Sequence, residues 1–165
     1  MVCAEGTQLT LATNLVASPA DAPSFAATIL AMEETVGLPQ TVLADAGYAS
    51  GPAVAELEAC GIEPLVAIAR TQPHRPYDFR PPPEPKPERR ITQPWRLAMK
   101  AKLESADGKA RYRKRKQTVE PVFGIIKSAV GFTRFHLRGL QKVAAEWLLV
   151  ALAYNCRRLH NLRPA

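Results

Sequence analysis

A proline-rich stretch constrains this chain more than any other feature, because it divides the sequence into parts that must fold differently. Eight of the 15 prolines in the 165 residues lie between Pro73 and Pro94. Proline lacks a backbone N–H and fixes φ, so helix is excluded there, and we predict an extended, polyproline-like insert over residues 71–94. The length fits one domain, built from residues 1–70 and residues 95–165 on either side of the insert.

The first part alternates between strand and helix patterns. Runs rich in Thr, Val, Leu and Ile predict strands over residues 7–16, 41–44 and 62–69. Between them, one helix is predicted from Asp21, as its N-cap, to Gly37, and another over residues 51–60. Strand, helix, strand, helix and strand in this order form a βαβαβ unit, so we predict an α/β fold for residues 1–70.

The last part is predicted to be helical. Residues 95–104 form a short candidate helix, and residues 140–159 form a long one with a stripe of apolar side chains. The middle of the long helix, from Trp147 to Tyr154, is apolar all round. We therefore expect it to be buried against the sheet.

Charge is divided just as sharply. Residues 1–69 contain eight acidic residues and no Lys or Arg, whereas residues 70–165 contain seven acidic residues and all 22 basic ones. A region with this excess of one sign attracts polyanions, and nucleic acid is the first candidate. A basic, solvated segment without a partner is the alternative.

Two classes of protein are excluded by composition. No apolar run approaches the roughly 20 residues of a membrane span, and the first residues lack the pattern of a signal peptide. We therefore expect neither an integral membrane protein nor a secreted one. Cys3, Cys60 and Cys156 are scattered and odd in number, which predicts free thiols in a reducing compartment rather than disulfides or a zinc site.

Asp45 is the first candidate for chemistry. It directly follows the predicted strand 41–44, at the strand end where α/β sheets place their ligands, and Gly47 permits a tight turn beside it. A turn or capping role is the commoner use of an aspartate at this place. Both interpretations stay open.

Glu120 is the second candidate. Glu120, Gly124 and Lys127 lie on one helical face, where the carboxylate suits a metal ligand and the lysine suits a phosphate contact. An ordinary solvated face is the alternative. Pro121 disfavours helical geometry at Glu120, so the helix either begins near this residue or kinks there.

A block of basic residues precedes Glu120 and forms the third candidate. It comprises Arg111, Arg113, Lys114, Arg115 and Lys116, with Tyr112 among them, and Arg134 follows later. Such residues hold DNA by its phosphates without reading the base sequence. Solubility, or stabilisation of a helix end, is the alternative.

These segments together resemble a known family. TVLADAGYAS around Asp45, TVEPVFGIIK around Glu120 and the final GFTRFHLRGLQKVAAEWLLVALAYNCRRL are similar, in order, to bacterial insertion-sequence transposases of the DDE type. Those transposases belong to the RNase H-like integrase and transposase superfamily, so the resemblance implies a mixed sheet flanked by helices. It also implies that Asp45 is the second catalytic aspartate, Glu120 the catalytic glutamate, and Lys127 the lysine of the motif Y-x2-R-x3-E-x6-K.

Two features depart from the family pattern. Tyr112 and Arg115 keep the Y-x2-R spacing, but Lys116 stands where the family arginine would fall, so either basic residue could serve. The family's first catalytic aspartate lies on the first strand of the sheet, and this chain is expected to begin one or two strands later. The apolar strand 42–44 would then lack a neighbour and leave an open edge.

The resemblance further implies DNA transposition by metal-dependent phosphoryl transfer on insertion-sequence ends and target DNA. Two Mg²⁺ (or Mn²⁺) ions about 4 Å apart perform this chemistry in the superfamily, and here Asp45 and Glu120 would be the metal ligands. The DNA-binding residues would be Lys127, Lys116, Arg115, Tyr112, Arg113 and Arg134. Without the first aspartate, we expect a truncated transposase that is inactive alone, forming a homo-oligomer or pairing with a complementing transposase chain at the nucleoid of the bacterial cytoplasm.

A non-catalytic nucleic-acid-binding protein on a transposase scaffold is the alternative function, since DNA binding needs only the basic residues. A Glu120→Gln substitution distinguishes the two, because an enzyme loses function and a binder keeps or gains affinity. A third interpretation is an interaction module whose Pro-rich residues 73–94 bind a groove on a partner.

Overall fold

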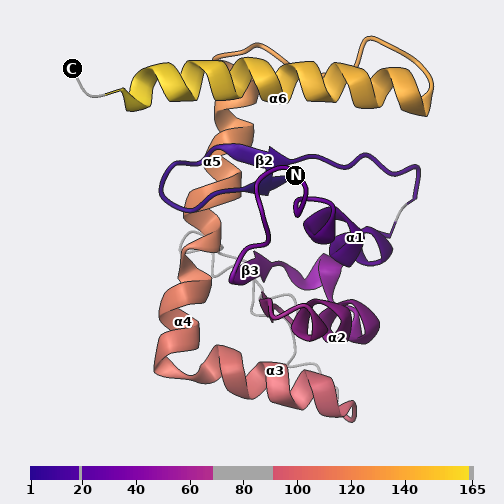
Figure 1. Cartoon of the computed structure of the whole chain (residues 1–165), viewed down its shortest axis with the longest axis vertical. Coiled ribbons are helices and arrows are strands. Elements are labelled where there is room, and N and C mark those ends of the chain that lie inside the picture. Colours follow the sequence, from indigo (N-terminus) through magenta and orange to yellow (C-terminus); the bar gives the residue numbers. More distant parts are fainter. Residues whose placement is uncertain (19, 69–90, 164–165) are drawn as a thin grey trace, which may run out of the picture.

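The computed structural model describes residues 1–18, 20–68 and 91–163. In chain order, its strands and α-helices are β1 (Val2–Cys3), β2 (Thr10–Ala12), α1 (Phe25–Leu30), β3 (Thr41–Ala44), α2 (Gly51–Ala59), β4 (Glu63–Val66), α3 (Pro94–Glu104), α4 (Ala106–Arg113), α5 (Arg115–Ser128) and α6 (Leu140–Leu162) (Figure 1). This mixture of helices and small sheets confirms the predicted α/β class. The insert predicted over residues 71–94 lies outside the described residues as far as residue 90.

The helices frame the strands. Helix α6 lies across one end of the molecule, and α5 and α4 run away from it along one side toward α3 at the other end (Figure 1). The β1–β2 hairpin lies next to α6, while α1, β3 and α2 lie between the hairpin and α3. Among the helices that the structure describes, none is long and apolar enough to cross a membrane.

Strands β3 and β4 pair in parallel, with Thr41 opposite Glu63 and Ala44 opposite Val66. Parallel neighbours need a crossover, and α2 supplies it, as the sequence predicted. Pro52 lies in the first turn of α2, where its missing N–H costs no hydrogen bond. Beyond the end of α2, Gly61 adopts a φ of +75°, a conformation that glycine accepts without strain.

The predicted three-stranded βαβαβ unit is wrong in its first strand. Only Thr10–Ala12 of the predicted strand 7–16 is extended, and it pairs antiparallel with β1 instead of joining β3. Gly6 and Gln8 take φ values of +78° and +58°, which turn the chain back between the two strands. The described part of residues 1–70 therefore contains a hairpin and a separate βαβ unit.

Helix α1 is shorter than predicted. It ends at Leu30 rather than running to Gly37, and irregular turns follow it. In these turns the Met32 carbonyl accepts hydrogen bonds from the N–H groups of Thr35, Val36 and Gly37. At the helix end, the N–H groups of Met32 and Glu33 donate to carbonyls three residues back, at Ile29 and Leu30, so the regular pattern of bonds between residues four apart stops there.

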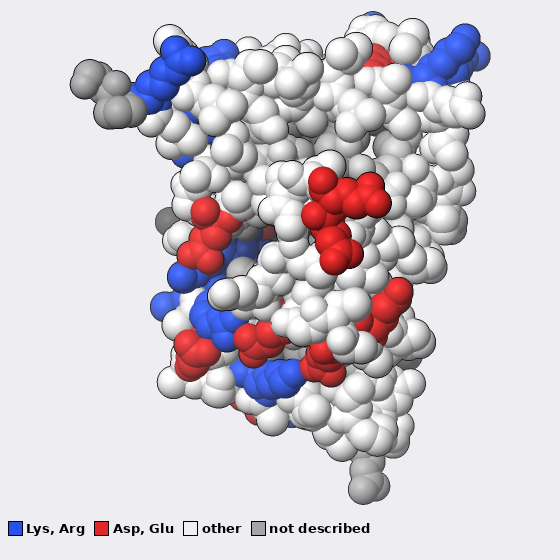
Figure 2. Space-filling view, viewed as in Figure 1, with Lys and Arg blue, Asp and Glu red and all other residues white. Residues whose placement is uncertain are grey.

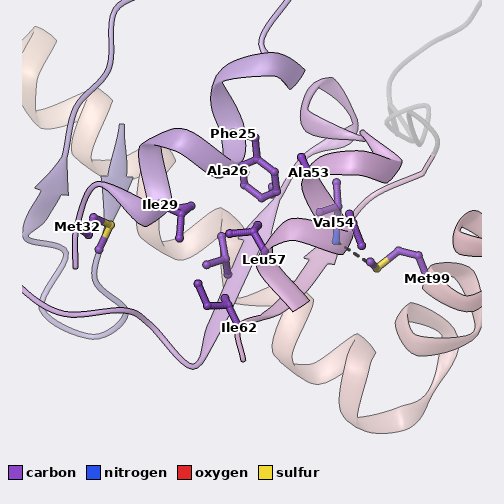
Figure 3. Packing of buried hydrophobic residues seen from close by; sticks show 12 residues of the cluster. Phe25, Ala26, Ile29, Met32, Ala53, Val54, Leu57, Ile62 and Met99 are labelled. Carbon is purple, nitrogen blue, oxygen red and sulfur yellow. Dashed lines mark hydrogen bonds between the residues drawn. The ribbon is translucent and has the colours of Figure 1, made fainter. Parts of the chain in front are cut away.

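The main hydrophobic core lies between α1, α2 and the β3–β4 sheet. Phe25 and Ile29 of α1 point toward Leu57 of α2, with Ile62 beside them (Figure 3). Helix α3 covers the far side, where the Val66 N–H donates to the Met99 sulfur at 3.5 Å. This bond closes the outer edge of β4, because a main-chain donor that would otherwise be unpaired has an acceptor.

A second core joins α5 to α6. Val122 and Ile126 of α5 pack on Trp147, Val150 and Tyr154 of α6, all of them buried. The prediction that the middle of α6 is buried against the sheet holds for one face only, because three large side chains there are mostly exposed: Leu148, Leu149 and Leu152. Helix α6 packs with one face only, against α5 and β2.

A tight corner connects α3 to α4. The Ser105 hydroxyl accepts a hydrogen bond from the Gly108 N–H at 3.0 Å and donates to the Lys102 carbonyl at 2.7 Å, so it caps α4 and ends α3 together. Gly108 lies so close to α3 that a Cβ there would overlap the Lys102 carbonyl oxygen. The corner thus requires glycine for space.

Gly108→Ala should lower the free energy of unfolding by about 1–3 kcal/mol, because a backbone oxygen cannot move aside as a flexible side chain can. The matched control is Gly124→Ala in the middle of α5, where a Cβ would meet no atom within 4 Å. That substitution should stabilise the protein by about 0.5–1 kcal/mol. Urea denaturation of both variants checks the opposite signs, and equal effects would contradict the prediction.

Candidate active site

Asp45 lies immediately after β3, as the sequence predicted. Its Oδ1 atom accepts a hydrogen bond from the Gly47 N–H at 2.9 Å, and Asp45 caps the short 3₁₀ turn Ala46–Tyr48. The turn role left open by the sequence is therefore present. The Oδ2 atom lies 4.0 Å from Arg115 Nη1, and about half of the side chain is exposed. One oxygen shapes the turn and the other stays accessible.

Glu120 is presented by α5, which runs through Pro121 without ending there. The helix begins at Arg115, so the alternative that it begins near Glu120 is wrong. Pro121 has no N–H to offer the Gln117 carbonyl, and the Gln8 side chain donates to that carbonyl instead, at 2.8 Å. The β1–β2 hairpin thus satisfies the bond that the proline removes. Glu120 itself is largely exposed.

Arg115 joins the two carboxylates. Its Nη1 lies 4.0 Å from Asp45 Oδ2, and its Nη2 lies 3.9 Å from Glu120 Oε1. The side chain is only 24% exposed, and its Nε is buried without a hydrogen-bond partner among the described residues. The sequence left Arg115 and Lys116 as equal candidates; the structure brings Arg115 to the carboxylates, while Lys116 is exposed.

Tyr112 fixes this arrangement from α4. Its hydroxyl donates to the Ala44 carbonyl at 3.1 Å, at the residue before Asp45. Burial raises the pKa of Tyr112, so the phenol keeps the proton that it donates. The Arg115 guanidinium lies 5.8 Å from the centre of the Tyr112 ring, a cation–π distance. Tyr112 therefore positions both the end of β3 and the guanidinium.

Arg111 adds a second link between α4 and the sheet. It forms an ion pair with Glu63 of β4 at 2.8 Å and donates to the Thr41 hydroxyl of β3. The hydrogen bond to Glu63 raises the pKa of the Arg111 guanidinium most, and Asp107 raises it further. Arg111 belonged to the predicted phosphate-binding block, but its contacts within the chain give it a structural role.

Asp21 is a residue that the sequence analysis misjudged. As the first residue before a short 3₁₀ turn it makes no side-chain capping bond, so the predicted N-cap role is wrong. Its carboxylate instead lies beside that of Asp45, with Gly47 next to both. A Cβ atom on Gly47 would lie 3.6 Å from Asp21 Oδ2 and 3.1 Å from Asp45 Oδ1. Burial raises the pKa of Tyr48 nearby, and the charges of both aspartates raise it further. No sequence spacing links Asp21 to Asp45, because only tertiary folding brings them together.

The other predicted DNA-binding residues form no ion pair with the two carboxylates. Arg113, Lys116, Lys127 and Arg134 are exposed, and none of the four forms an ion pair within the described part of the chain. On the face seen in Figure 2, basic side chains lie at the ends of α6, acidic ones lie over the region of α1, and the two kinds are mixed beside α4. The mixing reflects ion pairs between the acidic first part of the chain and the basic last part, such as Lys114 with Glu5 and Arg111 with Glu63.

Asp45 and Glu120 fit a divalent metal in type and number. Mg²⁺ prefers carboxylate oxygens and is usually held by one or two of them, with phosphate and water completing the octahedron. Within residues 1–18, 20–68 and 91–163, no group of three or more His, Cys, Asp or Glu side chains could hold a metal ion. A metal at this place would therefore share its two carboxylates with Arg115.

The site thus holds one carboxylate after the parallel strand β3 and another on helix α5, both close to one guanidinium. A family model of the transposase DDE domain matches residues 1–156. The chain belongs to the DDE transposase family. Membership connects the chain, at the level of the family, with DNA transposition, DNA binding and divalent metal ions. No curated protein and no solved structure matches the chain.

Proposed function

We propose that this DDE transposase chain acts in transposition on insertion-sequence ends and target DNA, with Asp45 and Glu120 as the ligands of Mg²⁺ or Mn²⁺. The observation that carries the proposal is that two carboxylates from distant parts of the chain come together. Asp45 follows β3 and Glu120 lies on α5, and both are within 4.0 Å of the same guanidinium. A bound metal would supply Lewis-acid stabilisation of charge on the phosphate oxygens. The proposed setting is the nucleoid of a bacterial cytoplasm.

The proposed DNA contacts are made by exposed cations around this site. Lys116 and Lys127 lie on α5 with Glu120, Arg113 ends α4, and Arg134 lies in the segment between α5 and α6. Because they are exposed and make no ion pair within the described chain, they can approach phosphates without losing an internal partner. Such contacts give affinity for any sequence.

We infer that the chain alone binds DNA without cleaving it. Arg115 lies near both carboxylates, so its guanidinium already supplies the positive charge that a metal ion would bring to Asp45 and Glu120. A metal pair needs a further carboxylate to bridge its ions, and the described residues offer no third ligand of this kind. A complementing transposase chain or a homo-oligomer would have to supply it.

A nicking assay on supercoiled plasmid tests this proposal. With Mg²⁺ or Mn²⁺ the purified chain should shift the plasmid in a gel without producing open circles. Strong nicking that disappears in Asp45→Ala would overturn the inactivity and support the metal role of Asp45. Absence of any gel shift at low salt would overturn the DNA-binding part.

The alternative function is DNA binding without catalysis, and the Arg115 bridge is the observation that favours it. Glu120→Gln separates the two in a transposition assay supplied with an active transposase chain. If the chain contributes to chemistry, the substitution abolishes its contribution. If it only binds, the substitution keeps or raises DNA affinity, since it removes one negative charge.

Arg115→Gln should raise the affinity for Mn²⁺ by about tenfold, because a positive charge about 4 Å from each carboxylate is removed. The matched control is Arg113→Gln, since Arg113 is exposed and outside the bridge. Titration of free Mn²⁺ by electron paramagnetic resonance measures both variants. Equal affinities in the two variants would show that the guanidinium does not compete with the metal.

A further inference from the structure

A cavity of about 480 Å³ separates the two sheets. Five consecutive residues at its wall, Met1 to Glu5, include β1, and five more, Thr41 to Asp45, include β3. From their partner strands only Leu11 of β2 reaches it, and β4 contributes no lining residue. A sheet face would expose alternate residues, so consecutive lining residues mean that the edges of β1 and β3 border the cavity.

The edge of β3 that borders the cavity has main-chain groups to offer. The Glu63 N–H donates to the Gln40 carbonyl, and the Ala67 N–H donates to the Ala44 carbonyl. The main-chain groups of the even-numbered residues of β3 therefore point toward β4. By the alternation of the pleat, Thr41 and Leu43 direct their N–H and C=O groups to the other side. From the remainder of the described chain, no main-chain hydrogen bond reaches these two residues.

The outer edge of β4 is treated differently. There the Met99 sulfur accepts from the Val66 N–H and α3 covers the strand. One side of the β3–β4 sheet is therefore closed by the chain itself, and no described residue pairs with the main chain of the side on the cavity. Sheets rarely leave such an edge without a cover or a partner.

The remaining walls suit the side chains of a strand. Phe25 and Ile29 of α1 and Val119 and Phe123 of α5 also line the cavity, which gives it an apolar surface beside the two edges. Arg115 lines it as well, and its buried Nε has no partner among the described residues. An occupant must thus bring alternating donors and acceptors, apolar side chains and one oxygen for Arg115.

We propose that the cavity binds an extended strand from a separate polypeptide, which pairs with β1 on one side and with β3 on the other. Five residues of strand span about 17 Å, the length of the edge 41–45. DNA cannot take this place, because its backbone carries no N–H donors for the Thr41 and Leu43 carbonyls. The inference goes beyond the proposed function and holds whether or not the chain cleaves DNA.

Three cysteines make the test possible in the unmodified chain. Cys3 lines the cavity and is partly buried, whereas Cys60 and Cys156 are exposed and lie elsewhere. Burial raises the pKa of the Cys3 thiol, so it reacts slowly but measurably at mildly alkaline pH. The two exposed cysteines serve as internal references for the alkylating reagent.

The probe is a synthetic peptide of alternating valine and threonine that ends in aspartate. Its control carries proline at every second position and so lacks the N–H groups of one edge. Alkylation by iodoacetamide is followed at each cysteine by mass spectrometry. With the strand peptide at ten times its Kd, Cys3 should react about tenfold more slowly, by mass action, while Cys60 and Cys156 keep their rates.

Three results would overturn the proposal. Unchanged reactivity of Cys3 at saturating peptide would mean that the cavity takes no strand. Equal protection by the proline peptide would mean that apolar contact alone drives binding. Protection of Cys3 without peptide that is lost on dilution, together with a dimer in sedimentation, would assign the cavity to a second copy of this chain instead of a separate polypeptide.

Discussion

Raising the salt concentration from about 50 mM to about 200 mM should weaken the binding of this chain to a DNA duplex by about a thousandfold or more. Residues 70–165 contain 22 basic residues against seven acidic ones, and exposed cations flank the site on α4 and α5. Each phosphate contact releases condensed counterions, so six or more contacts give roughly this salt dependence. Fluorescence anisotropy with a labelled duplex at several salt concentrations measures the slope.

Single substitutions locate the contacts. Lys116→Gln and Lys127→Gln should each lower the slope of log affinity against log salt by about one. The matched control is Lys100→Gln on α3, where Lys100 pairs with Glu104 at 3.7 Å. A slope that falls equally in all three variants would mean that charge acts on DNA over the whole chain rather than through α5.

Asn155→Ala should lower the free energy of unfolding by about 2–5 kcal/mol, and Tm by about 5–15 °C. The Asn155 side chain accepts from the Thr10 N–H and donates to the Thr10 carbonyl, both at 2.8 Å. Thr10 is buried, so the substitution leaves two main-chain groups of β2 without partners and without access to water. Differential scanning calorimetry of the variant measures the loss.

Asn161→Ala is the matched control for this prediction. Asn161 lies on the same helix and is exposed, so its removal should change Tm little. Circular dichroism at low temperature verifies that both variants keep the helical content. If Asn155→Ala melts at the temperature of Asn161→Ala, the paired bonds to Thr10 do not hold the hairpin in place.

Local patterns were sufficient for much of the fold. The sequence predicted β3, α2 and β4 because an apolar run, a proline in the first turn and a glycine after the last turn are signals within a few residues. The β1–β2 hairpin could not be predicted, since strands of two and three residues are too short for a periodicity. Side chains of α6, such as Asn155, hold it from more than 140 residues away.

The candidate site was also predictable only in part, because some of its contacts depend on tertiary packing. The local settings of Asp45 and Glu120 were enough to predict them as candidates, but they left Arg115 and Lys116 open. Spacing did not choose between them, because Arg115 lies three residues after Tyr112 and Lys116 lies four residues before Glu120, as the family motif requires of its single arginine. In the structure the Arg115 side chain points toward the end of β3, where it lies near Asp45 and over the ring of Tyr112 from α4. Only the packing of α4 against the sheet decides this.

For helix α6, the sequence could not predict which side packs within the chain. Its middle is apolar on both sides. Trp147 and Tyr154 bury one side, and Leu148 and Leu152 are left exposed on the other. A chain that also served a partner through this helix would have the same sequence pattern.

The bonds between α6 and the hairpin have a consequence for biosynthesis. Besides Asn155, the Tyr154 hydroxyl donates to the Gln8 carbonyl and Arg158 donates to the Thr7 carbonyl. The hairpin leaves the ribosome before α6 does, and Asn155 is translated 145 residues after Thr10, about 7–30 s later at ordinary rates of synthesis. A two-stranded hairpin is not stable alone. This part of the fold therefore closes only after α6 has been translated, and until then the main-chain groups of the hairpin lack the partners that α6 supplies.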